Sequence, residues 1–141
     1  MDASLRVAMA ATFIWLGMVL AISFLEAPLK FRAPGVTLAL GLGIGRLVSR
    51  ALNVCEFVLA VVISASLFTH QTPVGLDVAM ATAIAALLIQ NVLVRPQLAR
   101  RTAAVLAGEN GPRSTAHLVY IALEVVKVIA LIIAGVQLTG A

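Results

Sequence analysis

The sequence predicts an all-α integral membrane protein, a four-helix bundle, and two observations carry this prediction. The chain of 141 residues is 62% hydrophobic and 11% charged, against a usual charged share of about 25%. Four apolar runs also follow one another along the chain, each near the roughly 20 residues that a helix needs to cross the hydrocarbon core. Because a soluble domain of this size could not bury so much apolar surface, we expect lipid to surround it.

The first run, Val7–Leu25, contains no charged residue and predicts a spanning helix over residues 5–25. We expect this helix to be retained, because its apolar stretch is longer than that of a signal peptide and residues 26–28 make a poor cleavage site. The other spans are expected at residues 47–69, 75–94 and 116–138, in a single membrane domain over 1–141. Pro28 and Pro34 are expected to break the helix in the first connecting segment, 26–46.

Basic residues are concentrated in two of the segments between spans. Eight of the ten Lys and Arg residues lie in residues 26–50 or 95–113, whereas the segment His70–Asp77 has none. Since cytoplasmic loops carry an excess of Lys and Arg, segments 26–46 and 95–115 are expected in the cytoplasm and both termini on the other side. We expect a bacterial plasma (inner) membrane, and we exclude nucleic acid as a partner.

The second basic segment has the composition of a short helix that ends at Gly108. On it, Arg100 and Arg101 would meet either anionic lipid headgroups or solvent.

Small residues and a single cysteine suggest packing roles. Gly41, Gly43 and Gly45 favour close helix contact, so a homo-oligomer or a membrane-protein partner is expected. Cys55 is expected to be a buried packing thiol. The two halves share the plan of span, basic segment and span, but no internal repeat is convincing from the sequence.

Polar side chains form a stripe on the second span and another on the fourth. Because helical residues advance about 100° each, one stripe falls within roughly 120° and the other within roughly 80°. The stripes consist of Arg46, Arg50, Asn53 and Glu56, and of His117, Tyr120, Glu124 and Lys127. Both stripes begin at the cytoplasmic end, so residues at equal depth in the membrane can face each other. Asn91 on the third span is expected near the cytoplasmic end of the two stripes.

A charge at the centre of a spanning helix costs about 2.5–3.5 kcal/mol. Glu56, Glu124 and Lys127 are therefore expected to face the interior, with Lys127 paired to one of the two carboxylates. This arrangement would wall a polar cavity that opens to the cytoplasm. Such groups mark solute, ion or proton paths, but polar contacts between spans can also serve packing alone, at about 0.6 kcal/mol per bond.

Metal and haem sites are not expected. Glu56, Glu124 and His117 lack the close spacing that is typical of a metal site. A haem held by two histidines would need His70, which is expected near the opposite face of the membrane from His117.

Residues 90–138 resemble the transmembrane protein 205 family and its bacterial relatives, a domain of unknown function. The similarity rests on Asn91, Pro96, the Thr102-Ala103-Ala104 helix, Glu109, His117 and Gly135, and on the stretch Ser23–Phe31. The resemblance implies a four-span membrane protein without an established reaction.

The stretch Phe31–Glu56 is similar to the membrane-associated proteins of eicosanoid and glutathione metabolism. Arg46, Asn53 and Glu56 match the spacing of a signature on the second span of that family, although Ser49 stands where a further arginine is expected. This resemblance implies that glutathione would bind beside these side chains.

The sequence thus predicts a small membrane protein that handles a small solute, ion or proton in a cytoplasm-facing polar cavity. One alternative is a glutathione- or lipid-dependent membrane transferase, and another is an accessory subunit of a larger membrane complex. Whether the chain is an enzyme stays open, and no cofactor is expected except glutathione under the transferase alternative.

Overall fold

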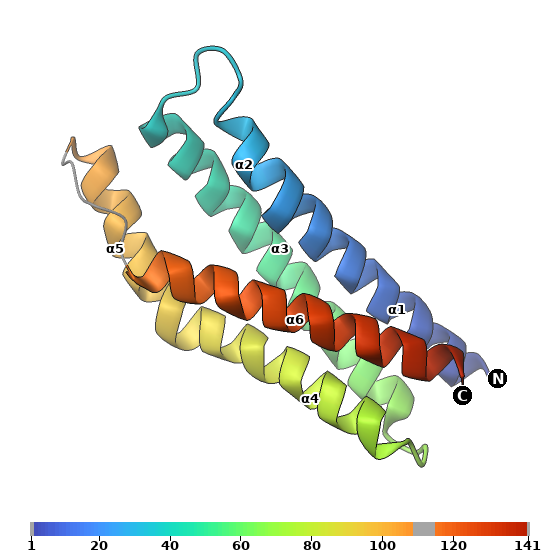
Figure 1. Cartoon of the computed structure of the whole chain (residues 1–141). Helices are drawn as coiled ribbons and strands as arrows, with labels where there is room; N and C mark the ends of the chain where they lie inside the picture. Colours follow the sequence, from blue (N-terminus) through green and yellow to red (C-terminus); the bar gives the residue numbers. More distant parts are fainter. Residues whose placement is uncertain (1, 109–114, 141) are drawn as a thin grey trace.

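The computed structural model describes residues 2–108 and 115–140, and all the regular structure in these two ranges is helical. Within them, four helical rods are long and apolar enough to cross a membrane: Ala3–Lys30, Leu38–Leu67, Val74–Val105 and His117–Thr139. The prediction of an all-α fold with four membrane-spanning helices is therefore confirmed. Both termini lie at one end of the bundle, opposite the end that carries α2 and α5 (Figure 1).

The first rod combines α1 (Ala3–Val19), the π-helix η1 (Leu20–Glu26) and α2 (Ala27–Lys30). It begins at Asp2, whose Oδ1 accepts a hydrogen bond from the Leu5 N–H at 2.9 Å and so caps the helix. The second rod, α3 (Leu38–Leu67), begins in the same way, because Thr37 Oγ1 accepts from the Leu40 N–H at 3.1 Å. The two rods pack along each other as a hairpin.

The third rod combines α4 (Val74–Ile89), the π-helix η2 (Gln90–Val94) and α5 (Arg95–Leu106), and the fourth is α6 (Thr115–Thr139). These two rods form a second hairpin, since α4 and α6 pack along each other. As predicted, α5 ends ahead of Gly108, which adopts a φ of 89° that favours glycine. Residues 109–114 of the expected segment 95–115 lie outside the described residues.

The prediction that Pro28 breaks the helix is wrong. Pro28 lies inside the first rod and Pro96 inside the third, each directly beyond a π-helical segment. A proline lacks the N–H that would bond one turn back, but in membrane helices a local π adjustment lets the backbone continue. The first connection is therefore short, from residue 31 to 37, and contains Pro34.

The two hairpins repeat one burial pattern at a spacing of 68 residues. Pro28 and Pro96 have this spacing (96 − 28 = 68), and so do Glu56 and Glu124 (124 − 56 = 68). The pairs that are buried in both halves are Ala8 and Leu76, Ala11 and Ala79, Thr12 and Met80, Trp15 and Ala83, Val19 and Leu87, Glu56 and Glu124, and Ile63 and Leu131. The repeat is hidden in the sequence because burial is kept while the residue types differ.

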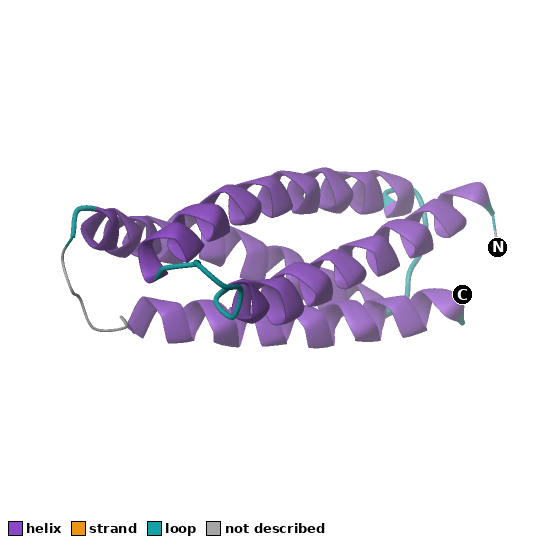
Figure 2. Ribbon diagram, turned by 90° about the horizontal axis from the view of Figure 1, so that it is seen from above, coloured by secondary structure: helices purple, strands orange, loops and turns teal. Residues whose placement is uncertain are grey.

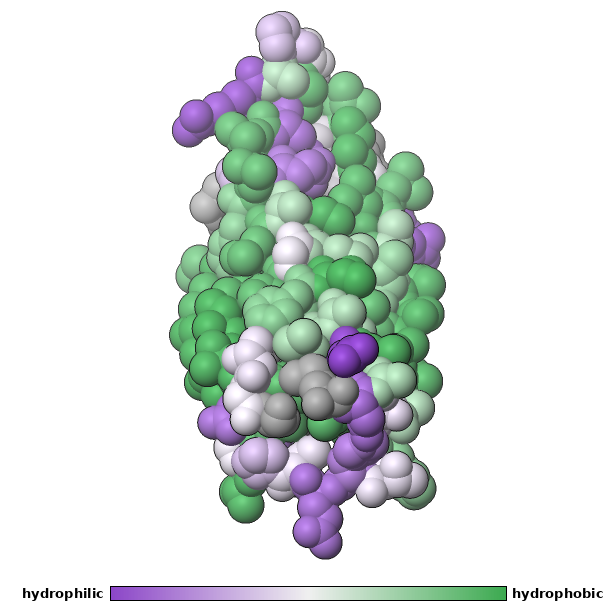
Figure 3. All heavy atoms as spheres, turned by 90° about the vertical axis from the view of Figure 1, so that its right-hand side faces the viewer, coloured by the Kyte–Doolittle hydropathy of each residue, from purple (hydrophilic) through white to green (hydrophobic). Residues whose placement is uncertain are grey.

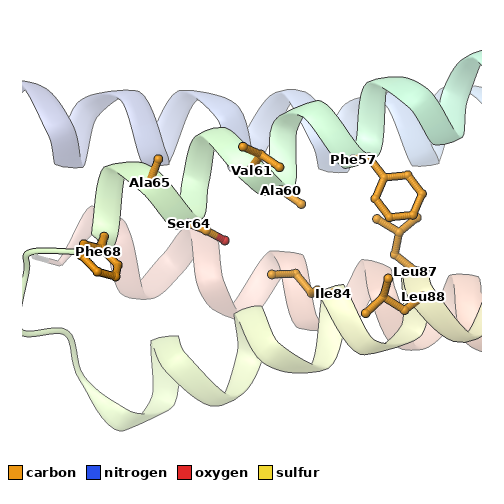
Figure 4. A pocket seen from close by; sticks show the side chains of 9 residues that line it. All are labelled: Phe57, Ala60, Val61, Ser64, Ala65, Phe68, Ile84, Leu87 and Leu88. Carbon is orange, nitrogen blue, oxygen red and sulfur yellow. The ribbon is translucent and has the colours of Figure 1, made fainter.

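The repeat is broken at one contact between the hairpins. α1 packs against α6, but the equivalent pair, α4 and α3, makes little contact. An apolar groove of about 400 Å³, here called the lateral groove, lies between them (Figure 4). Its lining consists of Phe57, Ala60, Val61, Ser64, Ala65 and Phe68 from α3 and Ile84, Leu87 and Leu88 from α4.

The outside of the bundle is largely apolar. On the face in Figure 3, hydrophobic residues cover most of the middle and hydrophilic residues gather toward the two ends. Cys55 is exposed, so the prediction of a buried thiol is wrong. It lies about 200° around α3 from Asn53 and shares the outward face with Val54 and Val58.

Candidate functional site

All four rods contribute to a buried polar cluster around Lys127. Lys127 Nζ lies 2.6 Å from Glu56 Oε2 on α3 and 2.6 Å from Glu124 Oε1 one turn back on α6. It also donates a hydrogen bond to Gln90 Oε1, at the start of η2, at 2.8 Å. An ammonium group has three N–H donors, so each donor of Lys127 has an acceptor.

The cluster is closed by two further donors. Trp15 Nε1 on α1 donates to Glu56 Oε2 at 2.8 Å, and Gln90 Nε2 donates to Glu124 Oε1 at 2.7 Å. None of these five side chains, which we call the Lys127 cluster, is more than 2% exposed. Pairing of Lys127 with Glu56 or Glu124 was predicted, and the structure has both pairs.

The Lys127 cluster has more acceptors than it can satisfy. Within the described ranges, Glu56 Oε1 and Glu124 Oε2 are buried without a hydrogen-bond partner. Two carboxylates face one ammonium, so the formal charge of the cluster is −1 when all three groups are ionised. A net charge buried at this depth is costly, and a proton or a hydrogen-bond donor would reduce that cost.

A cavity of about 770 Å³ leads from the end of the bundle that carries α2 and α5 toward this cluster. Its lining residues come from η1, α2, α3, α5 and α6. Figure 2 shows the bundle from above, with both termini at one end. The cavity lining includes five Lys and Arg side chains and one histidine, namely Lys30, Arg46, Arg50, Arg95, Arg101 and His117. Among the described residues, two carboxylates line it, Glu26 and Glu124, so the charge of the described lining favours an anion. We call this space the basic cavity.

The inner part of the basic cavity offers hydrogen-bond acceptors. Glu124 lies both in the cavity wall and in the Lys127 cluster, and therefore connects the two. Asn53 is 5% exposed, lines the same cavity, and its Oδ1 has no hydrogen-bond partner among the described residues. A ligand with a negative group for the arginines and a donor for these oxygens would suit both parts.

The nine residues expected at the site divide into three groups. Six line the basic cavity: Arg46, Arg50, Asn53, His117, Tyr120 and Glu124. Glu56 and Lys127 lie behind Glu124, within the cluster. Asn91 lines neither; its Nδ2 donates to the Leu87 carbonyl at 2.8 Å, and its Oδ1 accepts from Arg95 Nη1 at 3.2 Å.

Sequence reasoning missed three contributors to the site. A buried indole N–H usually finds an acceptor, and that tendency was the available signal for Trp15. Gln90 lies beside Asn91 in the sequence, and only the register of the third rod decides which of them faces inward. Arg95 reaches the cavity because the third rod continues straight into α5 through η2.

A separate polar contact closes the opposite end of the bundle. Asp2 Oδ2 lies 2.7 Å from His70 Nε2, between the first helix and the connection of α3 to α4. The hydrogen bond with His70, followed by the one from the Leu5 N–H, lowers the pKa of Asp2 below its ordinary value. This contact holds the start of α1 against the residues that follow α3.

A scan against models of protein families finds no match for this chain, and searches of curated proteins and of solved structures find none either.

Proposed function

We propose that this protein binds a small anionic solute in the basic cavity and couples that binding to uptake of a proton by the Lys127 cluster. The observation that carries the proposal is the juxtaposition of five Lys and Arg side chains with a buried carboxylate, Glu124, in one cavity. The cations would hold the negative group of the solute. Asn53 and Glu124 would accept a hydrogen bond from a hydroxyl or amine of the same solute.

The coupling to a proton follows from charge balance. When the cavity is empty, its cations offset the excess negative charge of the Lys127 cluster. A bound anion neutralises those cations, which leaves two carboxylates facing one ammonium in a medium of low dielectric constant. Uptake of one proton by the cluster restores the balance. Solute and proton would therefore bind together.

We propose that the basic cavity faces the cytoplasm of a bacterial inner membrane. Arg46, Arg50, Arg95 and Arg101 line it, and both connections at this end of the bundle belong to the basic segments. The rule that cytoplasmic loops are rich in Lys and Arg supports this orientation. Transport of the solute, as well as its binding, is part of the proposal.

The test is isothermal titration of the purified protein with a panel of anions: phosphate, glycerol 3-phosphate, succinate and glutathione. Two neighbouring arginines of α5 give a matched pair, because Arg101 lines the basic cavity and Arg100 is exposed outside it. Arg101→Gln should weaken binding several-fold, and Arg100→Gln should not. Equal effects of the two changes, or no binding by any anion of the panel, would contradict the proposal.

A second candidate is a transferase that holds glutathione. Arg46 and Asn53, two of the residues that carry the resemblance to the eicosanoid and glutathione family, line the cavity together with Arg50. Glu56, however, lies behind Glu124 and is engaged by Lys127 and Trp15. Glutathione is therefore included in the panel, and a marked preference for it over succinate would favour the transferase.

A further inference from the structure

The basic cavity and the lateral groove both lie along one seam, the boundary between the second and the third rods. The cavity has α3 on one side and α5 on another, while the groove lies between α3 and α4. Because α4, η2 and α5 form one continuous rod, the same two rods border both spaces. The seam is charged toward the α5 end and apolar toward the other.

Eight of the α3 residues that border the seam share one stripe of the helix. At an advance of about 100° per residue they fall within roughly 100°, whereas Ala65 of the groove and Gly41, Gly45 and Val48 of the cavity lie outside this arc. The stripe consists of Arg46, Arg50 and Asn53 in the cavity, followed by Phe57, Ala60, Val61, Ser64 and Phe68 in the groove. From Phe57 to Phe68 the groove runs for about 17 Å at the rise of an α-helix.

The chemistry changes sharply at the depth of the Lys127 cluster. On the side of the cluster toward α5, the cavity offers arginines that can bind an anion and Asn53 Oδ1, which can accept a hydrogen bond from a hydroxyl. On the other side of the cluster, Ser64 is the one polar residue among the described residues that line the groove, and the groove lies on the outside of the bundle, where Val61 and Phe68 are exposed. The groove is present because α3 and α4 do not repeat the close contact between α6 and α1.

We propose that the solute is a single-chain anionic lipid, with its charged head in the basic cavity and its acyl chain in the lateral groove. It would enter sideways from the membrane, between α3 and α4. This inference rests on the proposed function and adds the chemical class of the solute. The head brings the negative group and a hydroxyl, and the chain covers the apolar face of α3 that no helix covers.

Three probes separate the parts of the proposal. Oleoyl lysophosphatidate has a phosphate, a hydroxyl and one acyl chain; glycerol 3-phosphate lacks the chain; mono-oleoylglycerol lacks the charge. With the protein in phosphatidylcholine nanodiscs, lysophosphatidate should bind at least about tenfold more tightly than glycerol 3-phosphate, a difference of about 1.4 kcal/mol, because only lysophosphatidate has a chain that can fill the groove. Mono-oleoylglycerol should bind more weakly than lysophosphatidate.

A groove-filling variant tests the position of the chain. Ser64→Phe should remove the advantage of lysophosphatidate and leave the affinity for glycerol 3-phosphate unchanged. Ala65→Leu, a smaller change in the same groove, should reduce that advantage in part. Ile132→Phe is the matched control, because Ile132 is the exposed residue 68 positions after Ser64, on α6, and it should change neither affinity.

The outcomes are distinguishable. Equal affinity for lysophosphatidate and glycerol 3-phosphate overturns the lipid proposal and leaves the anion site standing. Mono-oleoylglycerol binding as tightly as lysophosphatidate overturns it as well, because the groove would then act without the cavity. If neither phosphate compound binds and the other anions of the panel fail too, the proposed function itself is wrong.

Discussion

Lys127 Nζ and Glu56 Oε2 lie 2.6 Å apart, although the two residues belong to different hairpins and are 71 positions apart in the sequence. Both side chains are fully buried. The contact joins α6 to α3, which the main-chain packing of the bundle does not bring into a continuous interface. The Lys127 cluster is therefore a polar connection between the two halves of the molecule.

Replacement of Lys127 by Met should strongly destabilise the protein. The change leaves Glu56 and Glu124 buried without their cation, and breaking a buried pair in this way costs about 3–5 kcal/mol. The free energy of unfolding in mixed micelles is the measurement. Arg100→Met, at an exposed position of α5, should stay within about 0.5 kcal/mol.

A second variant shows whether Lys127→Met loses stability through unpaired buried charge or through a packing defect. Adding Glu56→Gln to Lys127→Met removes one of the two uncompensated carboxylates, so the double variant should be more stable than Lys127→Met alone. A double variant that is less stable by the full sum of the two single changes would show that burial of charge is not the cause.

The hydrogen bond from Trp15 to Glu56 should be measurable in a double-mutant cycle. Trp15→Phe and Glu56→Met together should show a coupling energy of about 0.6 kcal/mol, the average for such bonds between membrane helices, and no more than about 1.7 kcal/mol. The cycle of Trp15→Phe with Glu124→Gln is the control, since no hydrogen bond joins those two residues. Coupling of equal size in both cycles would contradict the geometry.

The contact between Asp2 and His70 should make stability depend on pH in acid. Because the folded-state pKa of Asp2 is lowered, its carboxylate stabilises the fold above the unfolded pKa of about 3.9, and this contribution is lost as pH falls through the folded value. Thermal unfolding of the wild type and of Asp2→Asn, which keeps a helix-capping side chain, should therefore differ at neutral pH and converge below about pH 4. A difference that persists unchanged at pH 2 would contradict this assignment.

The orientation of the bundle can be tested by cysteine labelling in cells. In a Cys55→Ser background, Arg100→Cys should react only with reagents that reach the cytoplasm. Gln71→Cys, next to His70, which contacts Asp2 at the N-terminal end, should react with reagents that do not cross the membrane. The reverse pattern would put the basic cavity on the outer side.

The sequence was sufficient to predict the fold and the burial of the charged residues. Apolar length fixes the four spans, and the high cost of a charge in lipid forces Glu56, Glu124 and Lys127 inward, so their pairing follows from physics alone. Helical spacing then brings Arg50 and Asn53 to the same side as Glu56.

Other features depend on backbone detail that the sequence pattern does not carry. The π-helices let the first and third rods pass Pro28 and Pro96, which lengthens both rods and brings Arg95 to the cavity. The same local register turns Gln90 inward and Asn91 toward the Leu87 carbonyl. The lateral groove reflects a contact that α3 and α4 do not make, and no local pattern predicts it.

The most direct test of the central claim is to count the protons taken up when an anion binds. Isothermal titration of glycerol 3-phosphate at one pH, in two buffers with different ionisation enthalpies, gives that number. We predict about one proton taken up per anion by the wild type, from the charge balance of the Lys127 cluster, and none by Glu124→Gln, which should bind the anion at least as tightly. Anion binding by the wild type without proton uptake would contradict the account.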